Sequence, residues 1–498
     1  MITEMNVFDY LLGTSGFLHK EFLLGNKEQM SYADLHARSL NLARYLVNTY
    51  GQNNNILLIS PNSAYFIVVY MAIMKSGNVC VPLNPAIEEA NLSYIVELCG
   101  AKIAFIAESM QKRNWDLIEN VIFDYSELLK INGNYEPGIL DQNDFDEERV
   151  AEIIFTSGST GEPKGVMITH RNIIANTESI VEYLELSGDD IIEIVLPFYY
   201  CYGLSLLHTH MKVGGSIVLN NTFMFLGSVI NDLNNYACTG FSGVPSHFQI
   251  LLRKTRSFKE TDFPKLRYVT QAGGKLHNAF IREFTENFPE VRFFVMYGQT
   301  EATARLAYLE PEKLDEKLGS LGKAIPGVQL DIMDEAGKLI RKTGVVGEIV
   351  ARGENIMKGY LGDDEDTGKT LKDGWLHTGD IAYKDKDGYF FLTARKKEII
   401  KVGGRRISPK EIEEVIVSIP GVVDCSISGV FDDYLGEALK AEIVLSNGKK
   451  TGIDESYIKH YCGERLAMEK VPGIIQFKDR LEIASTGKKV KSLRSDTP

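Results

Sequence analysis

A glycine- and hydroxyl-rich segment, FTSGSTGEPKG at positions 155–165, has the composition of a phosphate-binding loop. Glycines leave backbone N–H groups free to approach an anion, hydroxyl groups add hydrogen-bond donors, and a lysine adds positive charge. It is not a Walker A loop, because Lys164 is followed by glycine rather than serine or threonine. An ordinary glycine-rich connection is the alternative. The predicted phosphate-binding residues are Thr156, Ser157, Gly158, Ser159, Thr160, Gly161 and Lys164.

Five further polar or glycine-rich segments follow this loop in a fixed order. They are YGQTE at 297–301, GEIVARGENIMKGYL at 347–361, WLHTGD at 375–380, RKKEIIKVGGR at 395–405, and Gly487-Lys488. With this series the chain resembles the adenylate-forming superfamily of acyl- and aryl-CoA ligases, firefly-type luciferases and the adenylation domains of peptide synthetases. The resemblance covers essentially the whole chain. It implies activation of a carboxylate by ATP, which yields an acyl-AMP and pyrophosphate.

The resemblance implies roles for residues of a nucleotide site. Thr300 would bond the α-phosphate, and Glu301 would hold Mg²⁺, because a carboxylate oxygen suits a hard cation. Tyr297 would stack on adenine, and Asp380 with its partner Arg395 would hold the ribose. A surface acid at Glu301 and a core tyrosine at Tyr297 are the alternatives. Further members of the predicted nucleotide site are Gly273, Gly274, Lys275, Gly298 and Gln299.

The same resemblance gives the C-terminal lysines separate tasks. Lys488 would reach between the carboxylate and the α-phosphate during adenylation. Lys397 occupies the family's hinge position, where a few residues can absorb a large change in backbone angles. After rotation, Lys401, Gly403 and Gly404 would face the site and border a tunnel for the thiol. The acceptor would be coenzyme A or the phosphopantetheine of a separate carrier protein.

The segment LPFYYCYGL at 196–204 would line the acid pocket. Cys201 stands where domains that activate α-amino acids place an aspartate. A substrate ammonium buried beside a thiol would lack its counter-charge, which is costly. We therefore expect an aryl or acyl acid without an α-amino group, in a mostly apolar pocket, and the sequence leaves the choice between the two open. The predicted substrate residues are Tyr200, Cys201, Gly203, Val244 and His247.

Alternating helix and strand patterns must position these residues. Apolar runs at 56–59 and 79–83 predict buried strands, and 35–46 has helical spacing, which favours α/β layers around a mostly parallel sheet. Thr169 is a plausible N-cap of a helix that would help hold phosphate. A helix after Pro409 and strands at 425–430 and 439–445 predict a compact α+β unit. We expect a large N-terminal domain of layered α/β subdomains, residues 1–395, and a small mobile α+β lid, residues 396–498.

Composition excludes several other classes. A net charge of −13 and an isoelectric point near 5.4 argue against nucleic acid as a partner. We find no basic cluster for an anionic membrane, no apolar run long enough to span a bilayer and no signal peptide. Six scattered cysteines without C-x-x-C spacing indicate neither zinc nor disulfides. A cytoplasmic location fits best.

Two interpretations from different classes remain for the whole chain. The favoured one is an acid–thiol ligase that uses ATP. The other is a catalytically inactive, nucleotide-binding relative that serves as a partner-binding module. The charged residues Lys164, Glu301, Asp380 and Lys488 argue against the second, because a decayed site has no reason to keep them. The acids at 363–366 are predicted to form a solvated loop, because consecutive side chains cannot converge on one ion.

Overall fold

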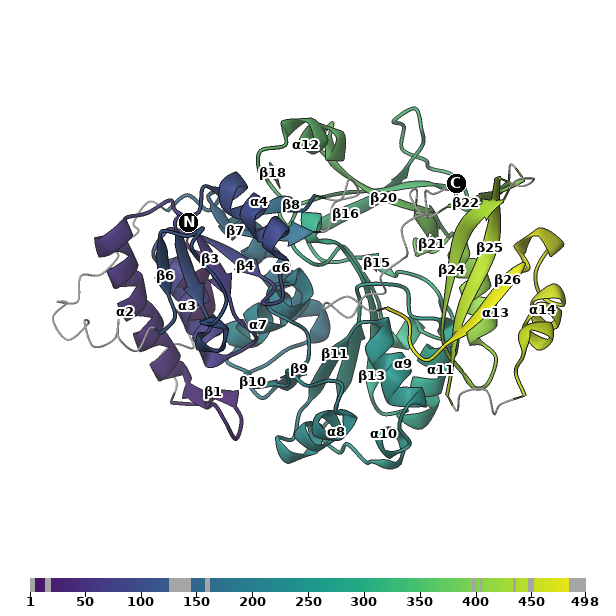
Figure 1. Cartoon of the computed structure of the whole chain (residues 1–498), viewed down its shortest axis with the longest axis horizontal. Helices are drawn as coiled ribbons and strands as arrows, with labels where there is room; N and C mark the ends of the chain where they lie inside the picture. Colours follow the sequence, from purple (N-terminus) through teal and green to yellow (C-terminus); the bar gives the residue numbers. More distant parts are fainter. Residues whose placement is uncertain are drawn as a thin grey trace.

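The computed structural model describes residues 5–13, 19–124, 145–156, 162–395, 399–403, 405–432, 436–446 and 452–482. Within these ranges the chain forms four β-sheets flanked by helices (Figure 1). A nine-stranded and a seven-stranded sheet make up most of the N-terminal part. The mixed α/β class predicted from the sequence is confirmed, with a large N-terminal and a small C-terminal part.

The nine-stranded sheet is parallel from β1 through β13, with antiparallel strands at both edges. The order of its strands across the sheet is β15 (Lys323–Ala324), β14 (Ala307–Leu309), β13 (Arg292–Tyr297), β12 (Tyr268–Gln271), β11 (Gly240–Gly243), β9 (Ile191–Ile194), β10 (Ser216–Leu219), β1 (Glu21–Leu24) and β2 (Met30–Ser31). Because ligands of such sheets bind beyond the carboxyl ends of parallel strands, the ends of β12 and β13 are where a site is expected.

The seven-stranded sheet carries the segment predicted to bind phosphate. Its order is β18 (Gly359–Tyr360), β8 (Lys164–Thr169), β7 (Val150–Thr156), β4 (Val79–Leu83), β3 (Asn55–Ile59), β5 (Ile103–Ile106) and β6 (Asn120–Ile122). The expected strands at 56–59 and 79–83 are β3 and β4. Strands β7 and β8 pair antiparallel, with Thr156 opposite Lys164, so the two ends of the predicted loop lie side by side.

Helices pack on both large sheets and join their cores. The α-helices of the N-terminal part are α1 (Val7–Leu12), α2 (Tyr32–Tyr50), α3 (Ala64–Lys75), α4 (Glu89–Cys99), α6 (His170–Leu184), α7 (Cys201–Val213), α8 (Leu226–Asn235), α9 (Pro245–Arg253), α10 (Ser257–Glu260), α11 (Asn278–Asn287) and α12 (Asp364–Thr370). Helix α3 is buried along nearly its whole length, as expected of a helix that is apolar all round. One apolar cluster contains residues of α3, α7 and both sheets.

Thr169 caps helix α6, as predicted, and forms a capping box with Asn172. The helix does not follow the phosphate segment directly, however, because strand β8 lies between them. Four apolar or small residues at 165–168 continue the pairing with β7 and carry the chain away from the loop. The expectation that this helix would help hold phosphate is therefore wrong.

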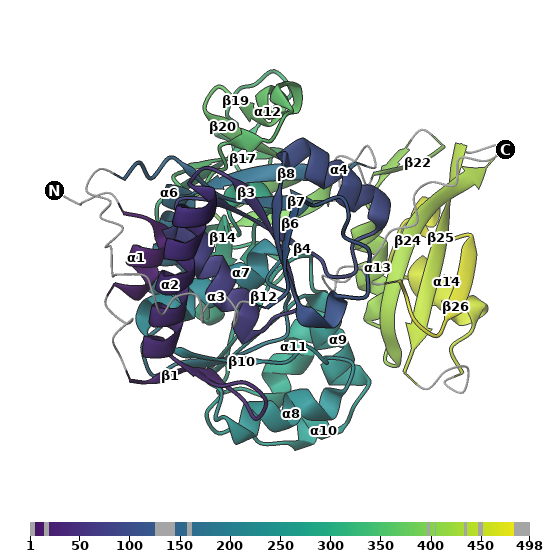
Figure 2. The same ribbon diagram turned by 60° about the vertical axis from the view of Figure 1, so that its left-hand side comes forward.

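Two smaller sheets follow along the chain. One contains β16 (Val328–Met333), β17 (Gly347–Gly353), β20 (Trp375–Lys384), β19 (Leu371–Lys372) and β21 (Phe390–Arg395). The other contains β23 (Arg405–Ile407), β22 (Ile400–Val402), β25 (Gly436–Leu445), β24 (Val422–Asp432) and β26 (Ile474–Lys478), with α13 (Pro409–Val417) and α14 (Glu455–Gly463). This last unit lies at one end of the molecule in both views (Figures 1 and 2). It matches the predicted α+β unit.

Candidate active site

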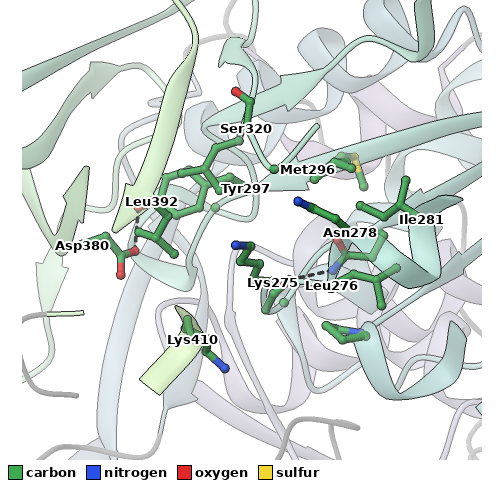
Figure 3. A pocket seen from close by; sticks show the side chains of 18 of the residues that line it. Lys275, Leu276, Asn278, Ile281, Met296, Tyr297, Ser320, Asp380, Leu392 and Lys410 are labelled. Atoms are coloured by element: carbon green, nitrogen blue, oxygen red, sulfur yellow. Dashed lines mark hydrogen bonds between the residues drawn. The ribbon is translucent and has the colours of Figure 1, made fainter. Parts of the chain in front are cut away.

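A cavity of about 190 Å³ opens beyond the carboxyl ends of β12 and β13. Its wall is built from segments that are far apart in the sequence and meet here (Figure 3). Six predicted nucleotide-site residues lie in this wall: Gly273, Gly274, Lys275, Tyr297, Gly298 and Asp380. We call it the larger cavity, to distinguish it from a smaller cavity that adjoins it.

Tyr297 and Asp380 meet across the larger cavity's wall. Tyr297 ends β13, Asp380 lies within β20, and the tyrosine hydroxyl donates a hydrogen bond of 2.7 Å to Oδ2 of the aspartate (Figure 3). Asp380 is only 2% exposed. The bond fixes the carboxylate beside the tyrosine ring, an arrangement suited to a ligand with a flat base and vicinal hydroxyls. In the pairing of β20 with β21, Asp380 stands opposite Arg395, whose side chain lies outside the described residues.

Gly298 allows the chain to turn sharply after β13. A Cβ atom at this position would lie 2.0 Å from the carbonyl oxygen of Ala304, so no other residue fits without moving the backbone. The tight return places Gln299 and Thr300 beside a second cavity of about 20 Å³. This smaller cavity shares Gly273 and Gly298 with the larger one, so the two adjoin.

The smaller cavity contains two of the five predicted substrate residues, Tyr200 and Cys201. The Cys201 thiol lies 3.5 Å from the Thr300 hydroxyl, so the acid-pocket segment and the YGQTE segment are in contact. Arg305 also lines this cavity, and nothing in the sequence analysis pointed to it.

The other three predicted substrate residues, Gly203, Val244 and His247, lie outside the lining of both cavities. Gly203 faces the backbone, since a Cβ atom there would lie 2.2 Å from the carbonyl oxygen of Pro197. The His247 ring packs on Phe223 with ring centroids 4.1 Å apart, and burial lowers the pKa of His247 to about 3. The sequence pattern could not distinguish residues behind the pocket wall from those in it.

Lys164 is held by acidic side chains at the phosphate side of the site. It forms an ion pair of 3.5 Å with Asp363 and a closer one with Asp366, and its ammonium lies 5.2 Å from the centre of the Tyr360 ring. Asp363 also caps helix α12 by accepting a hydrogen bond from the backbone of Asp366. The prediction of a loop at 363–366 is therefore wrong, although Asp364 and Glu365 are exposed to solvent as expected. Ser157, Gly158, Ser159, Thr160 and Gly161 lie outside the described residues.

Glu301 lies close to the same strands. Its carboxylate accepts a hydrogen bond of 2.8 Å from the Tyr360 hydroxyl, and Tyr360 pairs with Val166 of β8. Burial and the neighbouring Glu301 charge raise the pKa of Tyr360, so its hydroxyl stays protonated as a donor. Among the described residues there is no group of three or more metal-binding side chains. Magnesium is usually held by one or two carboxylates together with substrate phosphates, so a single carboxylate near the segment predicted to bind phosphate fits this ion.

Two of the predicted C-terminal residues, Lys401 and Gly403, are not brought to either cavity. Lys401 is exposed and its backbone N–H donates to Glu437, and Gly403 is exposed as well. Neither lines the larger or the smaller cavity. Lys397, Gly404 and Lys488 lie outside the described residues.

Another lysine of the C-terminal unit, Lys410, lines the larger cavity instead (Figure 3). It stands in the first turn of α13, where it pairs with Glu413 at 2.8 Å. The sequence predicted a helix after Pro409 but did not point to this lysine. Ser408 does not cap the helix, because its hydroxyl donates to the carbonyl of Thr393.

Glu414, the residue after Glu413 in α13, holds the C-terminal unit against the rest of the chain. Its carboxylate accepts from the backbone N–H of Asn278 at 2.7 Å and pairs with His277 at 3.1 Å and Lys275 at 3.5 Å. Burial favours the neutral carboxyl, but the hydrogen bond with His277 holds the pKa of Glu414 below its usual value. Helix α13 is thus fixed beside the larger cavity in this conformation.

No helix in the described part of the chain could span a membrane. None of its helices combines the length and the apolar character that crossing a bilayer requires.

Comparison with known proteins gives consistent matches over most of the chain. A family model described as AMP-binding enzyme matches residues 15–361, and one described as AMP-binding enzyme C-terminal domain matches residues 411–488. A feruloyl-CoA synthase from Amycolatopsis sp. is 30% identical, with 93% of this chain and 92% of that protein covered. An oxalate–CoA ligase from Arabidopsis thaliana is 29% identical, with 93% of each covered.

Solved structures agree. The o-succinylbenzoate CoA synthetase of Bacillus subtilis, in complex with its acyl-adenylate intermediate, aligns with a TM-score of 0.86 and 26% identity over 99% of each chain. A structure of the same synthetase with ATP and a magnesium ion has a TM-score of 0.83 and 26% identity, and covers 97% of this chain and 98% of that one.

Proposed function

The chain belongs to the AMP-binding enzyme family, and we propose that it is an ATP-dependent acid–thiol ligase that makes an acyl-CoA. In the first step a carboxylate oxygen attacks the α-phosphorus of ATP, and the bond to pyrophosphate breaks. In the second step the thiol sulfur of coenzyme A attacks the acyl carbon, and AMP leaves. The observation that carries this proposal is the larger cavity with its Tyr297–Asp380 pair, adjoining a smaller cavity at Thr300.

Within this proposal the larger cavity takes the nucleotide. The Tyr297 ring provides a flat surface for adenine, and Asp380 accepts hydrogen bonds from the ribose hydroxyls. Thr300, which lines the smaller cavity, bonds the α-phosphate where the acid attacks. Fixed donors at the reacting phosphate stabilise the charge that develops there, and little covalent chemistry is required of the protein.

The phosphate side would neutralise the leaving pyrophosphate. Lys164 and the segment from Thr156 to Gly161 would bind the β- and γ-phosphates. Glu301 would hold Mg²⁺, and this ion, when bound, neutralises charge on the phosphate oxygens. Replacing Glu301 by alanine should reduce turnover most strongly at limiting Mg²⁺. Tyr360→Phe keeps the carboxylate, so it should raise the Mg²⁺ concentration required for half-maximal turnover by only about 10-fold or less.

The C-terminal unit would act as a lid with two poses. We place the domain boundary at 395/396, because β21 ends at Arg395 and the following strands belong to a separate sheet. Rotation at Lys397 would exchange Lys488, required for adenylation, for the face that carries Lys401, Gly403 and Gly404. Coenzyme A is the acceptor we favour, and a carrier-bound phosphopantetheine is the alternative acceptor. The expected location is the cytoplasm.

Product analysis tests this function. The purified chain is incubated with ATP, Mg²⁺, coenzyme A and a panel of aryl and aliphatic acids, and acyl-CoA and AMP are measured by mass spectrometry. We expect both products with at least one acid, and loss of both in Lys164→Ala. A loaded carrier protein in place of coenzyme A separates the two acceptors. Nucleotide binding without AMP formation for every acid and acceptor would instead support the inactive, partner-binding relative.

A further inference from the structure

We propose that Arg305 determines which acid is used, by binding a second carboxylate of the substrate; this inference rests on the ligase function proposed above. Arg305 follows the YGQTE segment and is only 2% exposed, which makes it the largest fully buried side chain of the described residues. It lines the smaller cavity together with Tyr200, Cys201 and Thr300. A guanidinium cannot be deprotonated in a protein, so a full positive charge lies in this wall.

The protein compensates this charge only in part. The Nε–H group donates to the sulfur of Met296 at 3.4 Å, one terminal nitrogen donates to the carbonyl of Ala304 at 3.2 Å, and the guanidinium lies 4.1 Å from the centre of the Tyr202 ring. A sulfur is a weak acceptor. The guanidinium also interacts with the hydroxyl of Tyr183, which is a neutral group and supplies no counter-charge. No carboxylate of the described residues forms an ion pair with Arg305.

Such an arrangement is costly unless an anion supplies the missing charge. Burying a cation without a counter-charge opposes folding, and the aromatic ring offsets only a fraction of that cost. A carboxylate matches the planar fork of a guanidinium and can accept two parallel hydrogen bonds. The chemistry of the wall therefore selects for an anionic group in the smaller cavity.

The position of Arg305 is fixed before any substrate arrives. Its carbonyl oxygen accepts a hydrogen bond of 2.7 Å from the side chain of Asn355 and one of 3.4 Å from that of Asn176. Two residues before Arg305, Thr303 has a φ of 61°, which is unfavourable for a β-branched residue. Its hydroxyl donates a hydrogen bond of 2.7 Å to the carbonyl of Asn355, which holds this turn in place. A preorganised cation loses little entropy when it binds its partner.

Geometry also limits the length of the acid. The smaller cavity, with about 20 Å³, has room for one small group such as a carboxylate and not for a long chain. It adjoins the larger cavity through Gly273 and Gly298. A substrate whose reacting carboxylate faces the nucleotide at Thr300 would place its far end in this cavity. The substrate class is therefore a short dicarboxylic acid, within the non-amino acids expected from Cys201.

Paired acids test this inference. Malonate is compared with propanoate, and succinate with butanoate, by the kcat/KM of acid-dependent pyrophosphate release in wild type, Arg305→Met and Arg305→Lys. The wild type should prefer each dicarboxylic acid by on the order of 100-fold or more, because the monocarboxylic partner of the same carbon number leaves the guanidinium unpaired. Arg305→Met should lose this preference or reverse it. Arg305→Lys should retain part of it, since the charge remains and the planar fork is lost.

A matched variant separates specificity from a loss of folding. Arg292→Met removes another arginine, one that lies over Phe294 and pairs with Glu185 and Glu312 outside both cavities, and should leave the ratio unchanged. A purely structural role of Arg305 would lower kcat/KM for both acids of a pair equally. Equal loss, or a wild type that uses monocarboxylic acids as well as dicarboxylic ones, overturns the inference alone. If no acid of any class supports pyrophosphate release, the ligase function is overturned, and the inference with it.

Discussion

The Tyr297 hydroxyl donates a 2.7 Å hydrogen bond to Asp380, although the two residues are 83 positions apart in the chain. The bond ties the end of a parallel strand in the nine-stranded sheet to a strand of a different sheet. It brings a flat ring and a buried carboxylate to the same wall of the larger cavity, which is the combination that a nucleoside requires. The first prediction concerns this pair.

Asp380→Ala should raise the KM for ATP by about 10- to 100-fold, because hydrogen bonds to a charged group contribute roughly 1.5–3 kcal/mol. Tyr297→Phe keeps the ring and removes only the hydroxyl, so we expect a several-fold increase. Initial rates at varied ATP give both values. An unchanged KM in Asp380→Ala would contradict the assignment of the larger cavity to the nucleotide.

The ion pair between Lys164 and Asp366 predicts competition with the nucleotide phosphates. Asp366→Ala should lower the KM for pyrophosphate in the exchange reaction by about 2- to 5-fold, since a partly exposed ion pair contributes roughly 1 kcal/mol or less. Glu365→Ala is the matched control on the same helix, because Glu365 pairs with Lys369 and is largely exposed. Equal effects of both variants would show only a change in local net charge.

Much of the fold could be predicted because several strands and helix ends are encoded by local sequence patterns. The strands at 56–59 and 79–83 are continuous apolar runs, as expected of parallel strands buried on both faces. Thr169 was identified as an N-cap from its residue type and position. The nucleotide residues around Tyr297 and Asp380 could be predicted because their motifs occur in the order typical of the family that the chain resembles, and tertiary packing brings the two residues together.

The rest depends on long-range packing, which no local pattern reports. The pairing of Lys164 with Asp366 requires α12 to lie against the β7–β8 hairpin. Arg305 lies in a segment without a recognised motif. It is buried beside a cavity because the chain turns sharply after Gly298. Gly203 and His247 have residue types that suit a pocket, but the first contacts backbone and the second packs behind the wall.

The lid model predicts that Lys488 and Lys397 affect different half-reactions. Lys488→Ala should block formation of the acyl-AMP, yet convert a supplied acyl-AMP and thiol into the thioester. Lys397→Pro should do the reverse, because a fixed φ angle would prevent rotation. Each half-reaction is measured separately on both variants. Equal loss of the two steps in each variant would mean that rotation does not separate them.

A buried carboxyl beside the phosphate segment predicts a pH dependence of stability. Burial raises the pKa of Glu152 in β7 from 4.5 to about 7, and the hydrogen bond from Tyr70 at 2.8 Å lowers it only in part. Between these pH values the folded protein keeps a proton that the unfolded chain releases. Wild type should therefore lose roughly 3 kcal/mol of unfolding free energy relative to Glu152→Gln as pH rises from 4.5 to 7.

Urea unfolding of both proteins across this pH range measures that difference. Buried histidines outside the Tyr70–Glu152 network, such as His247, whose pKa burial lowers to about 3, also change stability with pH. Their contributions are common to both proteins and cancel in the difference. A difference that does not vary with pH would mean that Glu152 is ionised in the folded state.

Acid-dependent ATP–pyrophosphate exchange tests the central claim most directly, because it reports formation of the acyl-AMP without any thiol. Radiolabelled pyrophosphate, ATP and Mg²⁺ are supplied with aryl acids, aliphatic mono- and dicarboxylic acids, and the proteinogenic α-amino acids. We predict exchange with at least one acid that lacks an α-amino group, a requirement for Mg²⁺, and poor exchange with every amino acid, since Cys201 offers no counter-charge for an ammonium. Exchange that is absent with all acids, or fastest with an α-amino acid, would contradict the account.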